Sequence, residues 1–130
     1  MDTDTLIQEA RKVQKQAYAP YSQFHVGAAL VANDRLFTGC NVENLSFGLT
    51  ICAERVAVGA AIAAGCRNFQ RIVIFTDSKV PASPCGACRQ VLAEFAPDLP
   101  ILSANPSDDR FESTLTELLP RAKTGILENA

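Results

Sequence analysis

Long apolar runs, clustered positive charge and histidine are all scarce in this sequence of 130 residues. No apolar run reaches the ~18 residues that a helix needs to cross a bilayer, so we expect no membrane-spanning segment. The 12 Lys and Arg residues are scattered and the net charge is −2, which argues against a nucleic acid polymer as a partner. The acidic N-terminus lacks the order of a signal peptide, so we expect a cytoplasmic protein.

An even, secreted-type cysteine framework is absent as well. The chain has five cysteines, an odd number, so a set of paired disulfides explains them poorly. In a reducing compartment, clustered thiols more often bind metal or take part in chemistry. The cysteines are therefore the first place to look for function.

The composition is that of one globular domain spanning residues 1–130, without repeats, linkers or low-complexity segments. Strands that alternate with helices predict an α/β layered domain with a mixed sheet. We expect Asn33-Asp34 to form a hairpin turn, Gly65 to end a helix and Thr116 to cap a last turn at 117–119. Periodicity predicts helices over residues 2–18, 52–64 and 88–96 and strands over 24–32, 35–42, 70–77, 100–104 and 111–115.

The predicted helix at 52–64 consists mostly of small apolar residues. They cover every face of the helix, and a helix that is apolar all round is buried on all sides. We therefore expect this helix to lie at the centre of the domain.

Cysteines at two places form a pattern typical of a zinc site. Cys52 opens the apolar helix, and Cys85-Gly86-Ala87-Cys88 spans the start of the next one. Three thiolates hold zinc and leave its fourth position to water, which indicates hydrolytic chemistry.

The alternative from another functional class is a non-catalytic zinc-stabilised module, which needs a fourth protein ligand. Cys40 and Cys66 lie near the ends of elements, where small buried thiols are common. His25, the single histidine, alternates with apolar residues along a strand, where it is more easily a packed residue than a ligand.

Glu54 and Arg55 follow Cys52 directly. Glu54 is about 200° around the helix from Cys52, but in the first turn it can lean over the open metal position and carry protons. Otherwise it is a glutamate favoured by the helix dipole. Arg55 either donates to a ligand sulfur, which offsets the charge of the thiolates, or forms a surface salt bridge.

At these motifs the sequence resembles the small zinc-dependent cytidine deaminases that use three cysteines. The similarity runs from about residue 18 to 120, in order and at family-like spacing. It is carried by Ala19-Pro20-Tyr21-Ser22, Val26-Gly27-Ala28-Ala29-Leu30, Gly39-Cys40-Asn41-Val42-Glu43-Asn44, Cys52-Ala53-Glu54-Arg55, Pro84-Cys85-Gly86-Ala87-Cys88-Arg89-Gln90 and Glu117-Leu118-Leu119-Pro120.

The resemblance implies a three-layer α/β/α fold with a five-stranded mixed sheet, a homotetramer, and hydrolysis of cytidine and deoxycytidine with release of ammonia in pyrimidine salvage. It implies one Zn²⁺ per subunit on Cys52, Cys85 and Cys88, with Glu54 as the proton carrier. For the nucleoside it implies sugar contacts from Asn41 and Glu43, packing against Phe24, and base recognition by the backbone of Ala53 and Ser83. From the residues alone, the alternative for Asn41 and Glu43 is that they are turn-forming, solvated residues after a strand, and the alternative for Phe24 is that it is a core aromatic.

Two positions depart from the family pattern. Phe47 stands where the family often has a tyrosine, and Lys123 where it often has a phenylalanine that reaches a neighbouring subunit's base. Both changes concern substrate packing and subunit contacts, so a modified or related aminopyrimidine nucleoside remains an alternative substrate.

Overall fold

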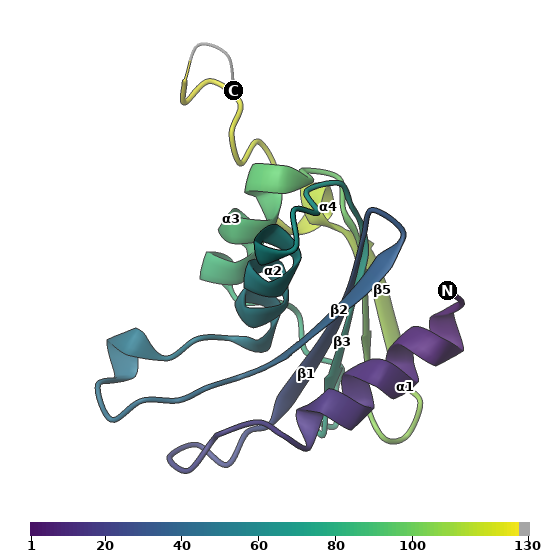
Figure 1. The fold of residues 1–130 in the computed structure, drawn as a ribbon, viewed down its shortest axis with the longest axis vertical. Coiled ribbons are helices and arrows are strands. Elements are labelled where there is room, and N and C mark those ends of the chain that lie inside the picture. The colour runs from purple at the N-terminus through teal and green to yellow at the C-terminus, as the bar shows by residue number, and fades with distance from the viewer. Residues whose placement is uncertain (128–130) are drawn as a thin grey trace.

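A five-stranded sheet runs through the centre of the protein in a computed structural model, of which we describe residues 1–127 (Figure 1). The strand order is β2-β1-β3-β4-β5. Only the β3–β4 pair is parallel, so the sheet is mixed, as predicted. The strands are β1 (Val26–Ala32), β2 (Arg35–Cys40), β3 (Phe69–Thr76), β4 (Pro100–Ala104) and β5 (Arg110–Thr114).

Helices cover both faces of the sheet and complete the predicted three layers (Figure 1). One face packs against α1 (Thr3–Gln14) through a cluster that includes Leu6, Val73 and Phe75. The other face carries α2 (Ala53–Ala63), α3 (Gly86–Phe95) and α4 (Leu115–Leu118), with a short 3₁₀ turn, η1 (Phe47–Leu49), in the loop before α2. No helix within residues 1–127 combines the length and the apolar character that a bilayer crossing requires.

The turn predictions are confirmed at two positions. Asn33 and Asp34 both have positive φ, 50° and 60°, the backbone conformation of a tight hairpin turn. Gly65 has φ +80° and follows α2, where the amide of Cys66 donates to the carbonyl of Ala61.

The helix predicted over residues 2–18 is shorter in the structure, where α1 ends at Gln14. The backbone of Tyr18 is used elsewhere: its amide donates to Asn41 O at 3.0 Å, and its carbonyl accepts from the amide of Glu43 at 2.8 Å. These bonds hold the chain after α1 against the loop that follows β2.

The first predicted strand begins too early. Gln23 has φ 60°, and the Asn41 amide side chain bridges Phe24 O and Val26 N, so regular pairing starts only at Val26.

The prediction that α2 is buried on all sides is wrong for the single chain. One face packs on the sheet through Ala53, Ala57 and Ala61, but Gly59 and Ala60 are exposed. An apolar pattern shows that a surface avoids water, but it does not show which molecule covers that surface.

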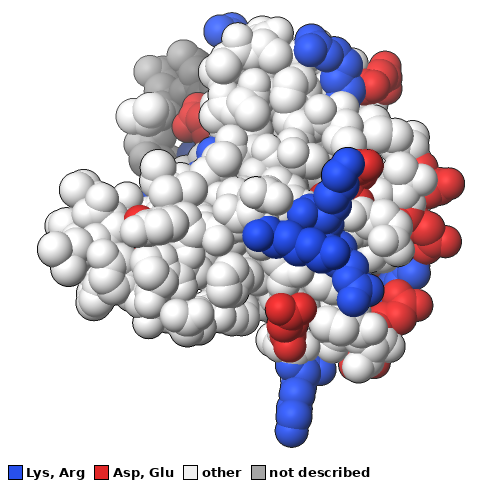
Figure 2. Space-filling model, turned by 60° about the horizontal axis from the view of Figure 1, so that its bottom comes forward, with Lys and Arg blue, Asp and Glu red and all other residues white. Residues whose placement is uncertain are grey.

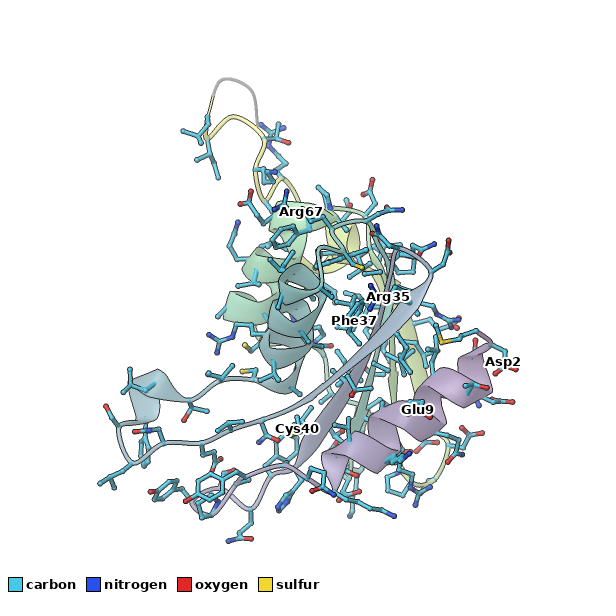
Figure 3. All side chains as sticks on the ribbon, in the orientation of Figure 1. Asp2, Glu9, Arg35, Phe37, Cys40 and Arg67 are labelled. Atoms are coloured by element: carbon cyan, nitrogen blue, oxygen red, sulfur yellow. The ribbon has the colours of Figure 1, made fainter. Side chains whose placement is uncertain are left out.

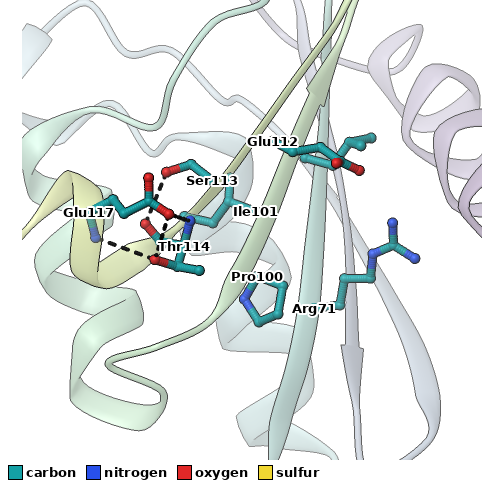
Figure 4. Close-up of a pocket in the computed structure, with 8 residues that line it drawn as sticks. Arg71, Pro100, Ile101, Glu112, Ser113, Thr114 and Glu117 are labelled. Carbon is teal, nitrogen blue, oxygen red and sulfur yellow. Dashed lines mark hydrogen bonds between the residues drawn. The ribbon is translucent and has the colours of Figure 1, made fainter.

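Thr114, and not Thr116, caps the last helix. The Thr114 hydroxyl accepts from the amide of Glu117, and the Glu117 carboxylate accepts from the amide of Thr114 (Figure 4). Thr116 instead donates to the carbonyl of Pro97 at 3.0 Å. The capping box forms at the strand end because α4 follows β5 without an intervening loop.

Candidate metal centre and substrate pocket

Three cysteine sulfur atoms meet between the starts of two helices. Cys52 is the N-cap residue of α2 and Cys85 that of α3, and Cys88 lies in the first turn of α3. The Sγ atoms of Cys52 and Cys85 are 3.9 Å apart, and those of Cys85 and Cys88 are 3.4 Å apart. Unpaired amides and the positive end of a helix dipole favour negative charge at both places.

This cluster fits a zinc ion. All three sulfur atoms lie within 4.8 Å of one another. A tetrahedral site with Zn–S bonds of about 2.3 Å places its sulfur atoms about 3.8 Å apart. Within residues 1–127, the cluster of potential ligands contains only these three residues, so the fourth position stays open to a water molecule.

The thiols of Cys52 and Cys88 affect each other's ionisation. The hydrogen bond from the Cys88 thiol, with smaller effects of Arg55 and Cys85, lowers the pKa of Cys52 to about 5, although burial opposes the shift. The same contact with Cys52, together with burial, raises the pKa of Cys88. The geometry thus already favours a thiolate at Cys52, which is the form that binds metal.

The other potential ligands lie elsewhere. Cys66 is buried, and its sulfur atom accepts from Arg35 Nη1 at 3.5 Å; Arg35 also stacks on Phe37 (Figure 3). Cys40, on β2, is partly buried, and this burial raises the pKa of its thiol. His25 Nδ1 lies 3.2 Å from Gln23 O. None of these side chains belongs to the sulfur cluster, so they provide no fourth ligand.

Glu54 is a buried carboxyl group beside the cluster. It is only 5% exposed, and it shares a pocket with Cys52 and Cys85. Burial raises its pKa, and the nearby Cys52 thiolate acts in the same direction. A carboxyl group with a raised pKa, next to an open metal position, has the properties of a proton carrier.

Arg55 contacts a ligand sulfur directly. Its Nη2 atom donates to Cys52 Sγ and to Thr50 O, both at 3.4 Å. The Cys52 thiolate raises the pKa of this guanidinium. Arg55 takes part in none of the ion pairs within residues 1–127. The structure therefore favours its contact with the ligand sulfur over a salt bridge on the surface.

A pocket of about 250 Å³ opens from the sulfur cluster. Its walls come from the loop before β1, the segment that follows β2, the start of α2, the end of β3 and the loop before α3. It brings together the predicted residues Phe24, Asn41, Glu43, Cys52, Ala53, Glu54, Ser83 and Cys85. Phe24 is 44% exposed, so it lines the pocket and is not a core residue.

Asn41 and Glu43 contribute polar side chains to the pocket. The Asn41 amide accepts from Val26 N at 2.9 Å and donates to Phe24 O at 2.7 Å. Glu43 Oε1 accepts from the amides of Tyr21 and Ser22, and Oε2 accepts from the Ser22 hydroxyl. One amide hydrogen of Asn41 and one lone pair of Glu43 Oε2 therefore remain for a ligand.

Sequence reasoning missed three polar residues of this pocket, Ser22, Thr50 and Thr76. Thr76 is 1% exposed and ends β3 directly after the apolar run 72–75. A polar residue at the carboxyl end of a buried strand is a signal that could have identified it.

The two departures from the family pattern lie outside the metal cluster. Phe47 is 72% exposed and packs edge-on against Tyr21, with ring centroids 5.9 Å apart. Lys123 folds back onto the end of α3, where its Nζ donates to Glu94 O at 3.2 Å.

A second hollow, about 410 Å³, lies beside β4 and β5, but it has no comparable chemistry (Figure 4). Arg71, Glu112 and Glu117 line it, and it contains no thiol.

The fold and the sulfur cluster together define the protein as a metal-dependent enzyme with one open coordination position.

Comparisons with known proteins narrow this class. Residues 1–102 match the family model for the cytidine and deoxycytidylate deaminase zinc-binding region. A cytidine deaminase of Sporosarcina psychrophila is 47% identical over 124 residues, which cover 94% of this chain and 91% of that protein. One from Halalkalibacterium halodurans is 48% identical over 126 residues, 95% and 96% of the two chains. The crystal structure of cytidine deaminase from Burkholderia pseudomallei has a TM-score of 0.90 at 46% identity, covering 93% and 98%.

The chain belongs to the zinc-binding cytidine and deoxycytidylate deaminase family. Its three-cysteine cluster fits one Zn²⁺ per chain.

Proposed function

We propose that the protein hydrolyses cytidine and deoxycytidine to uridine and deoxyuridine with release of ammonia. The observation that carries this proposal is the buried carboxyl group of Glu54 in one pocket with Cys52 and Cys85. Cys52, Cys85 and Cys88 would hold the zinc ion, which when bound would supply an activated water molecule as the nucleophile. The family membership and the relatives named above support the same activity.

Glu54 carries the protons of the reaction. As a base it takes a proton from the attacking water and delivers it to the ring nitrogen beside the amino-bearing carbon, which makes that carbon more electrophilic. The water oxygen bonds to that carbon. Glu54 then takes the second proton, from the hydroxyl group now on this carbon, and delivers it as an acid to the amino group; the carbon–nitrogen bond breaks, ammonia leaves and a carbonyl group remains. Its buried position keeps bulk water away from these transfers.

The remaining walls of the pocket bind the nucleoside in this proposal. The amide hydrogen of Asn41 and the lone pair of Glu43 that are still available suit the hydroxyl groups of a sugar. Phe24 packs against the nucleoside, and the backbone at Ala53 and Ser83 recognises the base. Arg55 offsets the negative charge of three thiolates through its contact with Cys52.

We also propose a homotetramer in which the loop between β2 and α2 lies at subunit contacts. Leu45, Phe47 and Leu49 in this loop are 79%, 72% and 66% exposed. The loop extends away from the sheet in Figure 1, and the left-hand side of Figure 2 is almost without charged side chains. An apolar surface of this kind favours contact with another protein surface.

The wider setting is part of the proposal. Five unpaired thiols fit a reducing cytoplasm, where the reaction serves pyrimidine salvage. One continuous sheet with helices on both faces supports a single catalytic domain over residues 1–130. Figure 2 shows one modest group of basic side chains on the displayed face and no basic stripe, which supports a small nucleoside over a nucleic acid polymer as the substrate.

The test is an ultraviolet assay with zinc-loaded protein on cytidine, deoxycytidine, cytosine and base-modified analogues. We expect turnover of the two nucleosides, and Glu43→Ala should reduce activity on nucleosides more than on the free base. Activity confined to a modified base would establish the alternative aminopyrimidine substrate. A zinc-loaded protein without deaminase activity would refute the proposal and favour the non-catalytic module.

A further inference from the structure

The wall of the pocket next to Cys85 is formed by a loop that has no regular secondary structure. Residues 77–84 connect β3 to α3 and include Ala82 and Ser83 of the pocket. Among residues 1–127, no backbone–backbone hydrogen bond involves a group of this loop. Its position must therefore depend on other contacts.

Side chains take the place of the missing backbone bonds. The Ser103 hydroxyl donates to Ala82 O at 2.6 Å, and the Asn105 amide donates to Ser78 O at 3.1 Å and to Lys79 O at 2.9 Å. At the end nearest the metal cluster, Arg89 Nε donates to Pro84 O at 2.8 Å. Four carbonyl groups of the loop are thus held by side chains from β4, from the residue after it and from α3.

A further contact comes from β3. The Ser78 hydroxyl donates to Val80 O at 2.6 Å and lies 2.7 Å from the Thr76 hydroxyl. A serine hydroxyl has one hydrogen, and the carbonyl of Val80 can only accept it. Thr76 must therefore donate to Ser78, so Thr76 turns only lone pairs toward the pocket.

Ser103 tethers the residue directly before Ser83, and Arg89 tethers the residue directly after it. Ser103 is 0% exposed and lies outside the pocket, and within residues 1–127 its hydroxyl has a single partner, Ala82 O. We propose that Ser103 is a positioning residue, which fixes the Ala82–Ser83 wall against the base of the substrate. This proposal rests on the proposed function, because that function gives Ser83 its role.

The experiment compares Ser103→Ala with a matched control, Ser113→Ala. Ser113 lies on β5 opposite Ile101, and its hydroxyl donates to Thr114 O, far along the chain from the loop. We expect Ser103→Ala to retain zinc and to lower kcat/KM for cytidine roughly tenfold, mainly through KM, since the wall contacts the substrate before and during the reaction. The control should stay within about twofold of the parent. Ser103→Thr keeps the donor and should recover most of the loss.

A second measurement does not depend on activity. Lys79 is exposed in the loop, so the rate of tryptic cleavage after Lys79 reports how firmly the loop is held. We expect faster cleavage there in Ser103→Ala, and an unchanged rate in Ser113→Ala.

Three outcomes would overturn the role of Ser103. They are parent-like kcat/KM in Ser103→Ala, parent-like cleavage after Lys79 in that variant, or equal effects in the Ser113→Ala control. If the parent protein deaminates none of the nucleosides, the proposed function fails, and the cleavage rates still decide whether Ser103 holds the loop.

Discussion

Single side chains in this protein combine structural and chemical tasks. Asn41 bridges Phe24 and Val26 and so starts β1, and the same amide reaches the pocket. Glu43 accepts from two amides and a hydroxyl of the loop before β1 while it lines the opening of the pocket. The two interpretations that the sequence left open for these residues, turn formation and ligand binding, are therefore compatible.

The ionisation of Glu43 provides a test at this scale. The hydrogen bond from Ser22 lowers the pKa of this carboxyl group below its ordinary value of 4.5. A carboxylate with a lowered pKa stabilises the folded loop when the pH is above the ordinary pKa of the group. That contribution is lost as the pH falls through the lowered pKa. Carbon NMR titration should show the low pKa in the parent and an upward shift in Ser22→Ala. Identical titration curves in the two proteins would contradict the role of the Ser22 contact.

At the scale of elements, the site depends on close packing between β2 and α2. A Cβ atom on Gly39 would lie 2.5 Å from both Ala53 O and Ala57 N. Only glycine therefore lets β2 approach the first turn of α2, which carries Glu54 and follows Cys52.

We expect Gly39→Ala to displace the start of α2, to destabilise the fold by about 1–3 kcal/mol and to reduce both zinc content and activity. Gly27→Ala is the matched control, because its Cβ atom would meet Ala10 O of α1 on the other face of the sheet. The control should lose stability but bind zinc fully. Denaturant unfolding with metal analysis checks both variants, and full zinc and activity in Gly39→Ala would contradict this packing argument.

Much of this element structure could be predicted from the sequence, for identifiable reasons. The apolar run 72–75 and the Asn33-Asp34 turn depend on local patterns, and both were predicted correctly. The end of α1 depends on bonds between Tyr18 and the distant Asn41 and Glu43, which periodicity does not record. The loop at 77–84 depends on Ser103 and Asn105, which are more than 20 residues away in the chain.

At the scale of the whole molecule, residues 1–127 leave exposed the apolar surface of the loop before α2 and the small residues on the outer face of α2. The sequence showed their apolar character, but burial in one chain was the wrong conclusion for Gly59 and Ala60. The proposed homotetramer accounts for both surfaces through contact between copies of the chain.

The assembly can be measured directly. Light scattering after size-exclusion chromatography should give four times the chain mass of 14.0 kDa. Leu49→Glu places a charge on the exposed loop and should lower this mass, because a buried unpaired charge is costly. Gln8→Glu adds the same charge to an exposed position of α1 and should leave the mass unchanged. A monomeric parent, or an intact tetramer in Leu49→Glu, would contradict the proposed contact.

The central claim is that a three-thiolate metal site with an open position works together with the Glu54 carboxyl group. Its most direct test measures zinc content and ammonia release from cytidine on the same samples of the parent and Glu54→Gln. We predict about one zinc per chain in both proteins and a turnover at least ~10²-fold lower in the variant, as expected for a missing general acid–base group. Near-parent turnover in zinc-loaded Glu54→Gln would contradict the claim.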